Sequence, residues 1–143
     1  MIFRTHLAFA FFIGLFFDFK SLIVILIGSL IPDLDTSNSK IGRKFIFSRL
    51  LNFLFGHRRF FHSLFFGAIL SFFVFLVFGK YYFMFFIGFC SHLLLDCLTK
   101  DGVMLFYPFE FKVKGFIKTN GIIENSIFLI LIFLIIIKLI NLG

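Results

Sequence analysis

Two side chains of metal-binding type, His92 and Asp96, lie four positions apart near the end of a long apolar stretch. On a helix, this spacing puts both side chains on one face, one turn apart. Imidazole nitrogens and carboxylate oxygens both bind transition-metal cations, and both groups are costly in lipid unless they are paired or coordinated. The spacing therefore fits either two metal ligands or an ordinary histidine–carboxylate pair at a helix end.

Further histidines and carboxylates lie in separate segments of the chain. Pro32 ends an apolar run, and the two carboxylates after it lie on backbone that can aim both at one centre. Each group also has an ordinary interpretation, as a polar residue at the membrane interface, a solvated loop, a basic cluster on lipid headgroups or a helix cap. The residues are His6, Asp33, Asp35, His57, His62 and Glu124.

Composition places the chain in a membrane. The 143 residues are enough for a single domain, 1–143, and 61% of them are hydrophobic, including 29 Phe. Several apolar runs approach the length that crosses a bilayer, which is more apolar surface than a soluble core needs. Cys90 and Cys97 lie seven residues apart on one expected helix, so they should not bridge each other. The N-terminal run, which is not followed by a cleavage site, is interpreted as an uncleaved first helix.

The predicted fold class is an all-α, polytopic membrane protein. Five apolar helices are expected in an up-and-down arrangement, together with an interfacial amphipathic helix over 45–56. The first two helices are short of the ~20 residues that a full span needs. Ser63 is the expected N-cap of the third helix, and a polar, irregular segment precedes the last. The five helices are expected at 1–17, 21–31, 64–79, 83–98 and 122–140.

If these helices alternate in direction, the histidines and carboxylates all fall on one side of the membrane. The basic residues agree, because only Lys20, Lys80 and Lys138 of the 14 Lys and Arg fall on the other side. Lys and Arg collect on the cytoplasmic side of membrane proteins. The sequence therefore predicts a multi-pass protein of the inner, cytoplasmic membrane with its polar site facing the cytoplasm. The same bias explains the net charge of +7 without nucleic acid as a partner.

The ordered set of motifs resembles the YdjM family over nearly the whole chain. That family is described as LexA-binding, inner-membrane-associated, metal-dependent hydrolases. Its pattern is in turn similar, more distantly, to that of the helical zinc phospholipase C and P1 nuclease group, which hydrolyses phosphoesters at a trinuclear zinc site. The matching motifs are Thr5-His6, Ile31-Pro32-Asp33-Leu34-Asp35, His57-Arg58-Arg59-Phe60-Phe61-His62-Ser63, Ser91-His92-Leu93-Leu94-Leu95-Asp96, Thr99, Gly102 and Tyr107-Pro108-Phe109.

The resemblance implies a set of metal ligands. The soluble zinc enzymes also use a late helix carrying a His-x-x-x-Glu pattern, whereas this chain has no histidine after His92 and offers Glu124 alone. One or two cations are therefore expected instead of three. Zinc is the first expectation, and manganese and iron suit the same ligands. The implied ligands are His6, Asp33, Asp35, His57, His62, His92 and Asp96, with Glu124 as the substitute from the last helix.

Two functions from different classes follow. The first is a membrane-bound metal-dependent hydrolase of a phosphoester, with a phospholipid as one possible substrate, in which Asp35 accepts a proton and Arg58 and Arg59 hold the phosphate. The second is a non-enzymatic binding or regulatory protein whose histidine–aspartate cluster is structural. A small transporter is a weaker third option, because the polar residues gather at one end and do not line a path. Nothing in the sequence identifies a protein partner.

Overall fold

The computed structural model describes residues 1–35 and 60–142, and this part of the chain is helical. Two isolated β-bridges, Thr99 with Ile117 and Val103 with Val113, are its only extended pairings. The all-α prediction is therefore confirmed for the described residues. The elements are α1 (Phe3–Gly14), α2 (Phe19–Leu30), the 3-10 helix η1 (Ile31–Asp35), α4 (Leu64–Phe78), the 3-10 helix η3 (Gly79–Tyr81), α5 (Tyr82–Cys97) and α6 (Ile122–Ile140).

Two helix starts are set by side-chain caps. Asp18 accepts hydrogen bonds from the backbone N–H groups of Lys20 and Ser21 at the start of α2. The hydrogen bond from the Ser21 hydroxyl is the main cause that lowers the pKa of the Asp18 carboxyl. Ser63 caps α4 by accepting from the N–H of Phe66, as its position in the sequence predicts.

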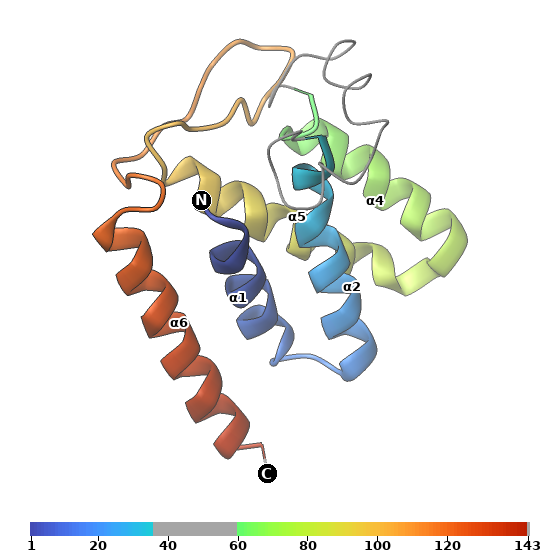
Figure 1. Cartoon of the computed structure of the whole chain (residues 1–143). Coiled ribbons are helices and arrows are strands. Elements are labelled where there is room, and N and C mark those ends of the chain that lie inside the picture. Colours follow the sequence, from blue (N-terminus) through green and yellow to red (C-terminus); the bar gives the residue numbers. More distant parts are fainter. Residues whose placement is uncertain (36–59, 143) are drawn as a thin grey trace.

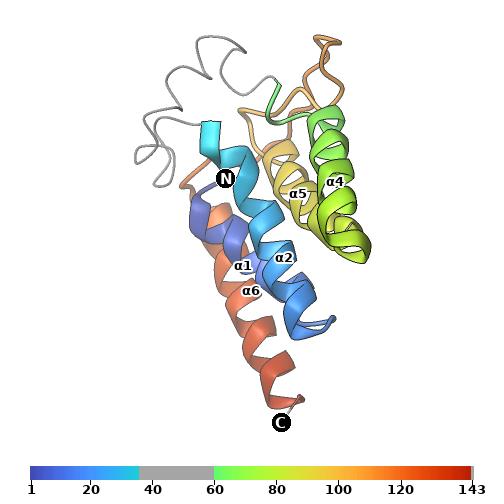
Figure 2. The ribbon, with the colours of Figure 1, turned by 90° about the vertical axis from the view of Figure 1, so that its right-hand side faces the viewer.

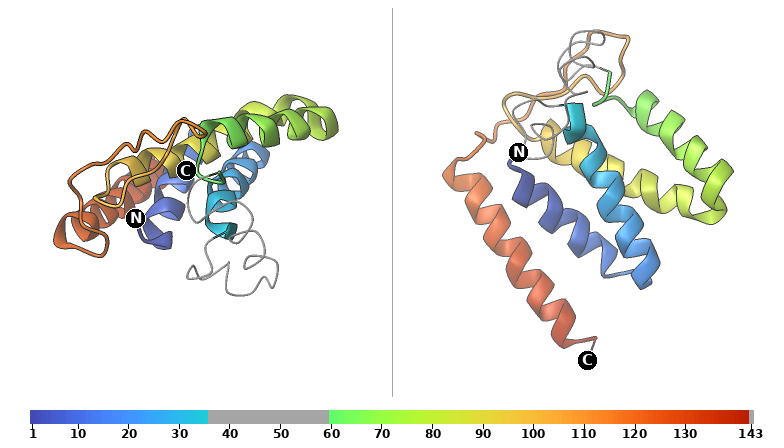
Figure 3. Two further views of the ribbon diagram at one scale, coloured as in Figure 1. Left: turned by 90° about the horizontal axis from the view of Figure 1, so that it is seen from above. Right: turned by 45° about the vertical axis from the view of Figure 1, so that its right-hand side comes forward.

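The helices form an irregular row. Seen from above, α6 and α4 lie at opposite edges, with α1, α2 and α5 between them (Figure 3). The most extensive contact is between α2 and α5, while α6 packs on α1 and α4 packs on α5. The N-terminus, the end of α2, the start of α4 and the end of α5 all lie at one end of the molecule, away from the C-terminus (Figures 1 and 2).

Glycines allow α2 and α5 to touch backbone to backbone. A Cβ atom on Gly88 would overlap the carbonyl oxygen of Ile25, and one on Gly28 would overlap the carbonyl oxygen of Phe85. Small residues at such crossings are typical of helices that pack inside membranes. Ile25 and Phe89, which flank this crossing, are fully buried. The crossing therefore fixes the position of α5 relative to α2, and with it the predicted ligands His92 and Asp96 on α5.

The structure contains fewer candidate membrane spans than the five apolar helices of the prediction. By length and composition, two stretches of the described chain can cross a membrane: Leu64–Cys97, which contains α4, η3 and α5, and Ile122–Ile140, which is α6. Five apolar helices do form. However, α1 and α2 have 12 residues each, or about 18 Å at 1.5 Å per residue, against ~30 Å of hydrocarbon. The interfacial helix predicted over 45–56 lies outside the described residues.

The α2–α5 crossing leads to a first prediction. Replacing Gly88 with Val places a branched side chain against the Ile25 backbone, which cannot move without separating α2 from α5. We expect the free energy of unfolding to fall by about 1–3 kcal/mol, measured by equilibrium unfolding in detergent. Ala68→Val is the matched control, because it places the same branched side chain at an exposed position of α4. Equal stability of both variants would contradict the close crossing.

Candidate metal centre

The structure brings five of the predicted ligands to one end of the bundle. His6 lies in the first half of α1, Asp33 lies in η1, His62 directly precedes the Ser63 cap of α4, and His92 and Asp96 lie in the last turns of α5. The expected one-turn spacing holds, since His92 Nε2 is 3.5 Å from Asp96 Oδ2. Four separate segments thus converge on a single buried place.

His92 is fixed by a hydrogen bond from its far side. Its Nδ1 lies 2.8 Å from the carbonyl oxygen of Ser29 in α2. A carbonyl only accepts hydrogen bonds, so Nδ1 carries the proton and, in the neutral ring, Nε2 carries a lone pair. That nitrogen faces Asp33 Oδ1 at 3.9 Å as well as Asp96. A lone pair that faces two carboxylates favours a cation or an added proton between them.

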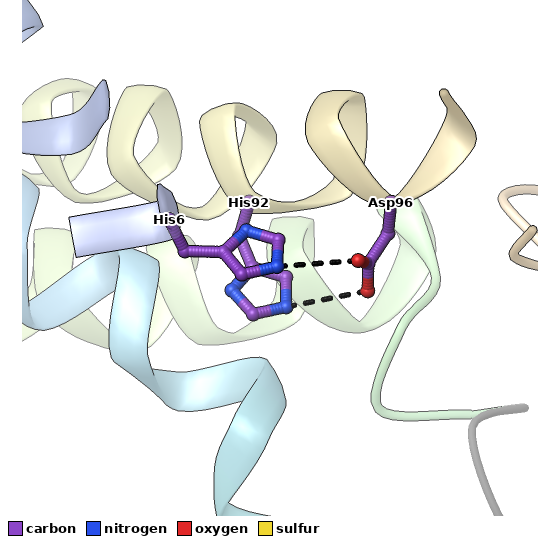
Figure 4. Close-up of side chains that lie close together, drawn as sticks. All are labelled: His6, His92 and Asp96. Atoms are coloured by element: carbon purple, nitrogen blue, oxygen red, sulfur yellow. Dashed lines mark ion pairs between the residues drawn. The ribbon is translucent and has the colours of Figure 1, made fainter. Parts of the chain in front are cut away.

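Asp96 lies at the centre of the cluster. Its Oδ1 is 3.2 Å from His6 Nε2, and the amino group of Met1 also contacts that oxygen. Its Oδ2 is 3.7 Å from His62 Nε2 and faces His92. Figure 4 shows the carboxylate opposite the edges of the two stacked rings of His6 and His92. One carboxylate thus faces all three imidazoles.

The ring contacts limit the charge that the histidines can carry. The rings of His6 and His92 are stacked, with centroids 3.8 Å apart and planes 9° from parallel. All three histidine side chains are buried. Two imidazolium ions in such contact would repel each other strongly in a poorly hydrated place. The arrangement therefore favours at least one neutral ring, which is the form that binds metal.

The donor set fits a divalent cation. Among the described residues, two groups each offer three ligand atoms within 4.8 Å of one another, and His92 belongs to both. Within residues 1–35 and 60–142, the buried nitrogens His6 Nδ1 and His92 Nε2 have no hydrogen-bond partner, and such atoms normally find one. Imidazoles and carboxylates suit zinc, manganese or iron. The first group consists of His6, His92 and Asp96. The second consists of Asp33, His62 and His92.

Glu124 has a different set of contacts. It is fully buried at the start of α6, where it accepts hydrogen bonds from the backbone N–H groups of Ile2 and Asn120, the latter at 2.6 Å. The Thr5 hydroxyl also donates to it, at 3.2 Å. Glu124 belongs to neither three-ligand group. Its carboxylate ties the first turn of α1 to α6, next to His6.

The structure does not describe the side chains of the remaining predicted site residues. Asp35 ends η1, but its side chain lies outside the described part of the chain, as do His57, Arg58 and Arg59. Their assignments as ligand, base and phosphate-binding residues stay predictions. Two contacts of the site had no signal in the sequence. One is the Ser29 carbonyl on His92, and the other is the backbone pairing of Glu124.

Comparison with known proteins identifies the family of the chain and a relative of its larger part. A family model described as "YdjM inner membrane protein" matches residues 1–142. The "Uncharacterized protein YvsG" of Bacillus subtilis (strain 168) is 38% identical over 106 residues, which cover 71% of this chain and 66% of that protein. The match therefore spans just under two thirds of the relative's length. No solved structure matches the chain.

The contacts of Glu124 lead to a second prediction. Glu124→Gln keeps the shape but offers one acceptor oxygen where two backbone N–H groups need separate ones. We expect the free energy of unfolding to fall by about 1–3 kcal/mol, while the folded protein keeps the wild-type cation content at saturating metal. Unfolding in detergent and elemental analysis measure the two quantities.

A neighbouring residue provides the control for this prediction. Asn125 accepts a hydrogen bond from Arg4 at 2.6 Å at the exposed surface of the same helix turn, so Asn125→Ala should change stability by about 0.5 kcal/mol or less. If Glu124→Gln instead loses cation at unchanged stability, Glu124 is a ligand and its structural assignment is wrong.

Proposed function

The chain belongs to the YdjM inner membrane protein family, and we propose that it works in that membrane as a metal-dependent hydrolase of a phosphoester. The observation that carries the proposal is the setting of His92. Its Nδ1 is held by the Ser29 carbonyl, while its buried Nε2 faces two carboxylates, and no described residue places a proton donor between them. A metal-binding histidine typically donates its other N–H to a carbonyl or carboxylate in this way.

The cation would be held by the five converging side chains. His6, His92 and Asp96 form one group, and Asp33 and His62 extend it through His92. Zinc is the first candidate, with manganese and iron suited to the same donors. A divalent cation at this place supplies Lewis acidity, which lowers the pKa of a water molecule and stabilises charge on a phosphoryl oxygen.

The protein's own groups then handle orientation and protons. The Ser29 carbonyl holds the His92 ring, and the Glu124 contacts hold the turn of α1 that carries His6. A carboxylate that is not fully engaged accepts a proton from the attacking water, and Asp35 is the proposed base. Arg58 and Arg59 are the proposed phosphate contacts, because a guanidinium binds phosphate through two parallel hydrogen bonds.

The membrane setting favours a lipid phosphoester over a soluble one. The cluster lies at one end of the apolar helices, and the described chain contains two stretches long enough to cross the bilayer. A phosphoester at the headgroup level of a phospholipid could reach such a place without leaving the bilayer. We further propose a multi-pass topology with this end in the cytoplasm, where Lys and Arg collect.

A non-enzymatic role is the second candidate, and one observation favours it. Asp96 already contacts the His6 ring and the amino group of Met1, so the carboxylate has one cationic partner, the amino group, without a metal. In that case the cluster stabilises the packing of α1 on α5 and carries no chemistry. The two candidates differ in metal content, which makes them separable by experiment.

Asp96→Asn separates the two candidates. The change keeps the shape but removes the negative charge that faces three imidazoles. For a hydrolytic metal site, we expect cation affinity and phosphoesterase activity to fall by about 10–100-fold or more. Elemental analysis of the detergent-purified protein and hydrolysis of phospholipids and aryl phosphodiesters measure both quantities.

Asp18→Asn is the control for this experiment. Asp18 caps α2 at the opposite end, and Asn is an equally good cap, so cation content and activity should be unchanged. A wild-type protein without stoichiometric metal, together with an Asp96→Asn variant of equal or higher stability, would overturn the enzyme proposal.

Topology is tested by cysteine labelling. In a background where Cys90 and Cys97 are serine, single cysteines replace Lys112 and Asn141. A membrane-impermeant maleimide should label Cys at 112 only from the cytoplasmic side and Cys at 141 only from the other, because the largely apolar, 19-residue helix α6 separates the two ends. Labelling of both positions from one side would contradict the crossing by α6.

A further inference from the structure

The loop between α5 and α6, residues 98–121, covers the end of the bundle that holds the cluster (Figure 1). The Thr99 hydroxyl donates to the Asp96 carbonyl at 2.8 Å, and the N–H of Leu64 donates to the Leu105 carbonyl at 2.9 Å. Val103 and Val113 exchange two backbone hydrogen bonds that close the loop on itself. The loop is therefore ordered, with an inner face toward the helices and an outer face away from them.

The two faces differ in an unusual way. The inner face buries Thr99, Val103 and Ile117, each at most 2% exposed. The outer face carries four phenylalanines with more than half of each side chain exposed, which is where an ordinary loop would carry polar residues. They are Phe106 at 53%, Phe109 at 73%, Phe111 at 67% and Phe116 at 70%.

Basic side chains are interleaved with these rings. Lys112, Lys114 and Lys118 are exposed between and beside the phenylalanines, and Lys100 is exposed at the start of the loop. The carboxylates of this segment are Asp101 and Glu110. The outer face is therefore apolar and positively charged, which is the composition of surfaces that lie in the headgroup layer of anionic membranes.

The position of α6 places the outer face of the loop at the level of the lipid headgroups. The helix begins at Ile122 and runs for 19 residues, about 28 Å at 1.5 Å per residue, which matches the hydrocarbon thickness of a bilayer. The residues that directly precede Ile122 must then lie at the interface. Ile122 itself is 85% exposed, so the apolar surface continues from the helix onto the loop.

We propose that loop 104–118 docks on the anionic headgroup layer of the membrane that holds the protein. The phenylalanine rings enter the upper acyl region, and the lysines pair with lipid phosphates. The occupant is a phospholipid surface because exposed rings and exposed lysines are interleaved along this segment, whereas the core of a protein–protein interface is depleted of lysine.

The chain contains no tryptophan, so a single Phe111→Trp variant of the full-length protein carries one fluorescent reporter. It is reconstituted into nanodiscs whose acyl chains are brominated near the headgroup, either zwitterionic or with an added anionic phospholipid. We expect strong quenching and a blue-shifted emission in the anionic discs, and a clear loss of both in the zwitterionic discs.

Two further variants complete the test. Phe133→Trp, exposed at mid-length of α6, reports insertion and should respond equally in both lipids. Adding Lys112→Gln, Lys114→Gln and Lys118→Gln to Phe111→Trp should abolish the difference between the two lipids. Equal quenching of Phe111→Trp in both lipids, or water-like emission in both while Phe133→Trp is inserted, would overturn the proposal.

Discussion

The backbone contact between α2 and α5 is the constraint on which the cluster depends. Gly28 and Gly88 let the two helices approach until carbonyl groups replace side chains at the crossing. One turn further along, the same approach brings the Ser29 carbonyl within 2.8 Å of His92 Nδ1. A wider crossing would leave that nitrogen without its acceptor, and Nε2 would no longer be directed at the carboxylates. Helix packing thus determines the orientation of a side chain that could bind metal.

Charge balance is the second constraint. Two carboxylates and three imidazoles share a buried space, and removing charged groups from water costs several kcal/mol each unless they are compensated. Asp96 and Asp33 both face His92 Nε2, at 3.5 Å and 3.9 Å. A divalent cation would compensate the carboxylates and occupy the imidazole lone pairs together. Protonated histidines would do so less well, because stacked cationic rings repel.

The sequence predicted those features of the site that depend on local spacing. The i, i+4 relation of His92 and Asp96 placed them correctly on one helix face, and Ser63 was recognised as a cap from its position before an apolar run. The hydrogen bonds to Ser29 and Glu124 could not be foreseen, because they involve backbone atoms of segments distant in sequence. The apolar runs also indicated that the first two helices are shorter than a full span, as α1 and α2 are, but they did not give the number of spans, since two stretches of the described chain are long enough to cross a membrane.

The short helices explain why the site forms at one end of the bundle. The α-helix α2 ends at Leu30, and the chain goes on as the 3-10 helix η1. This change places Asp33 next to His92, near the end of α5. Because α1 is equally short, its first turns reach the same level and His6 stacks on His92. The loop after α5 then closes over these ends through Thr99. A cluster built in this way lies at the end of the bundle, and its geometry depends on glycine contacts between α2 and α5 that lie about one helical turn away from its side chains.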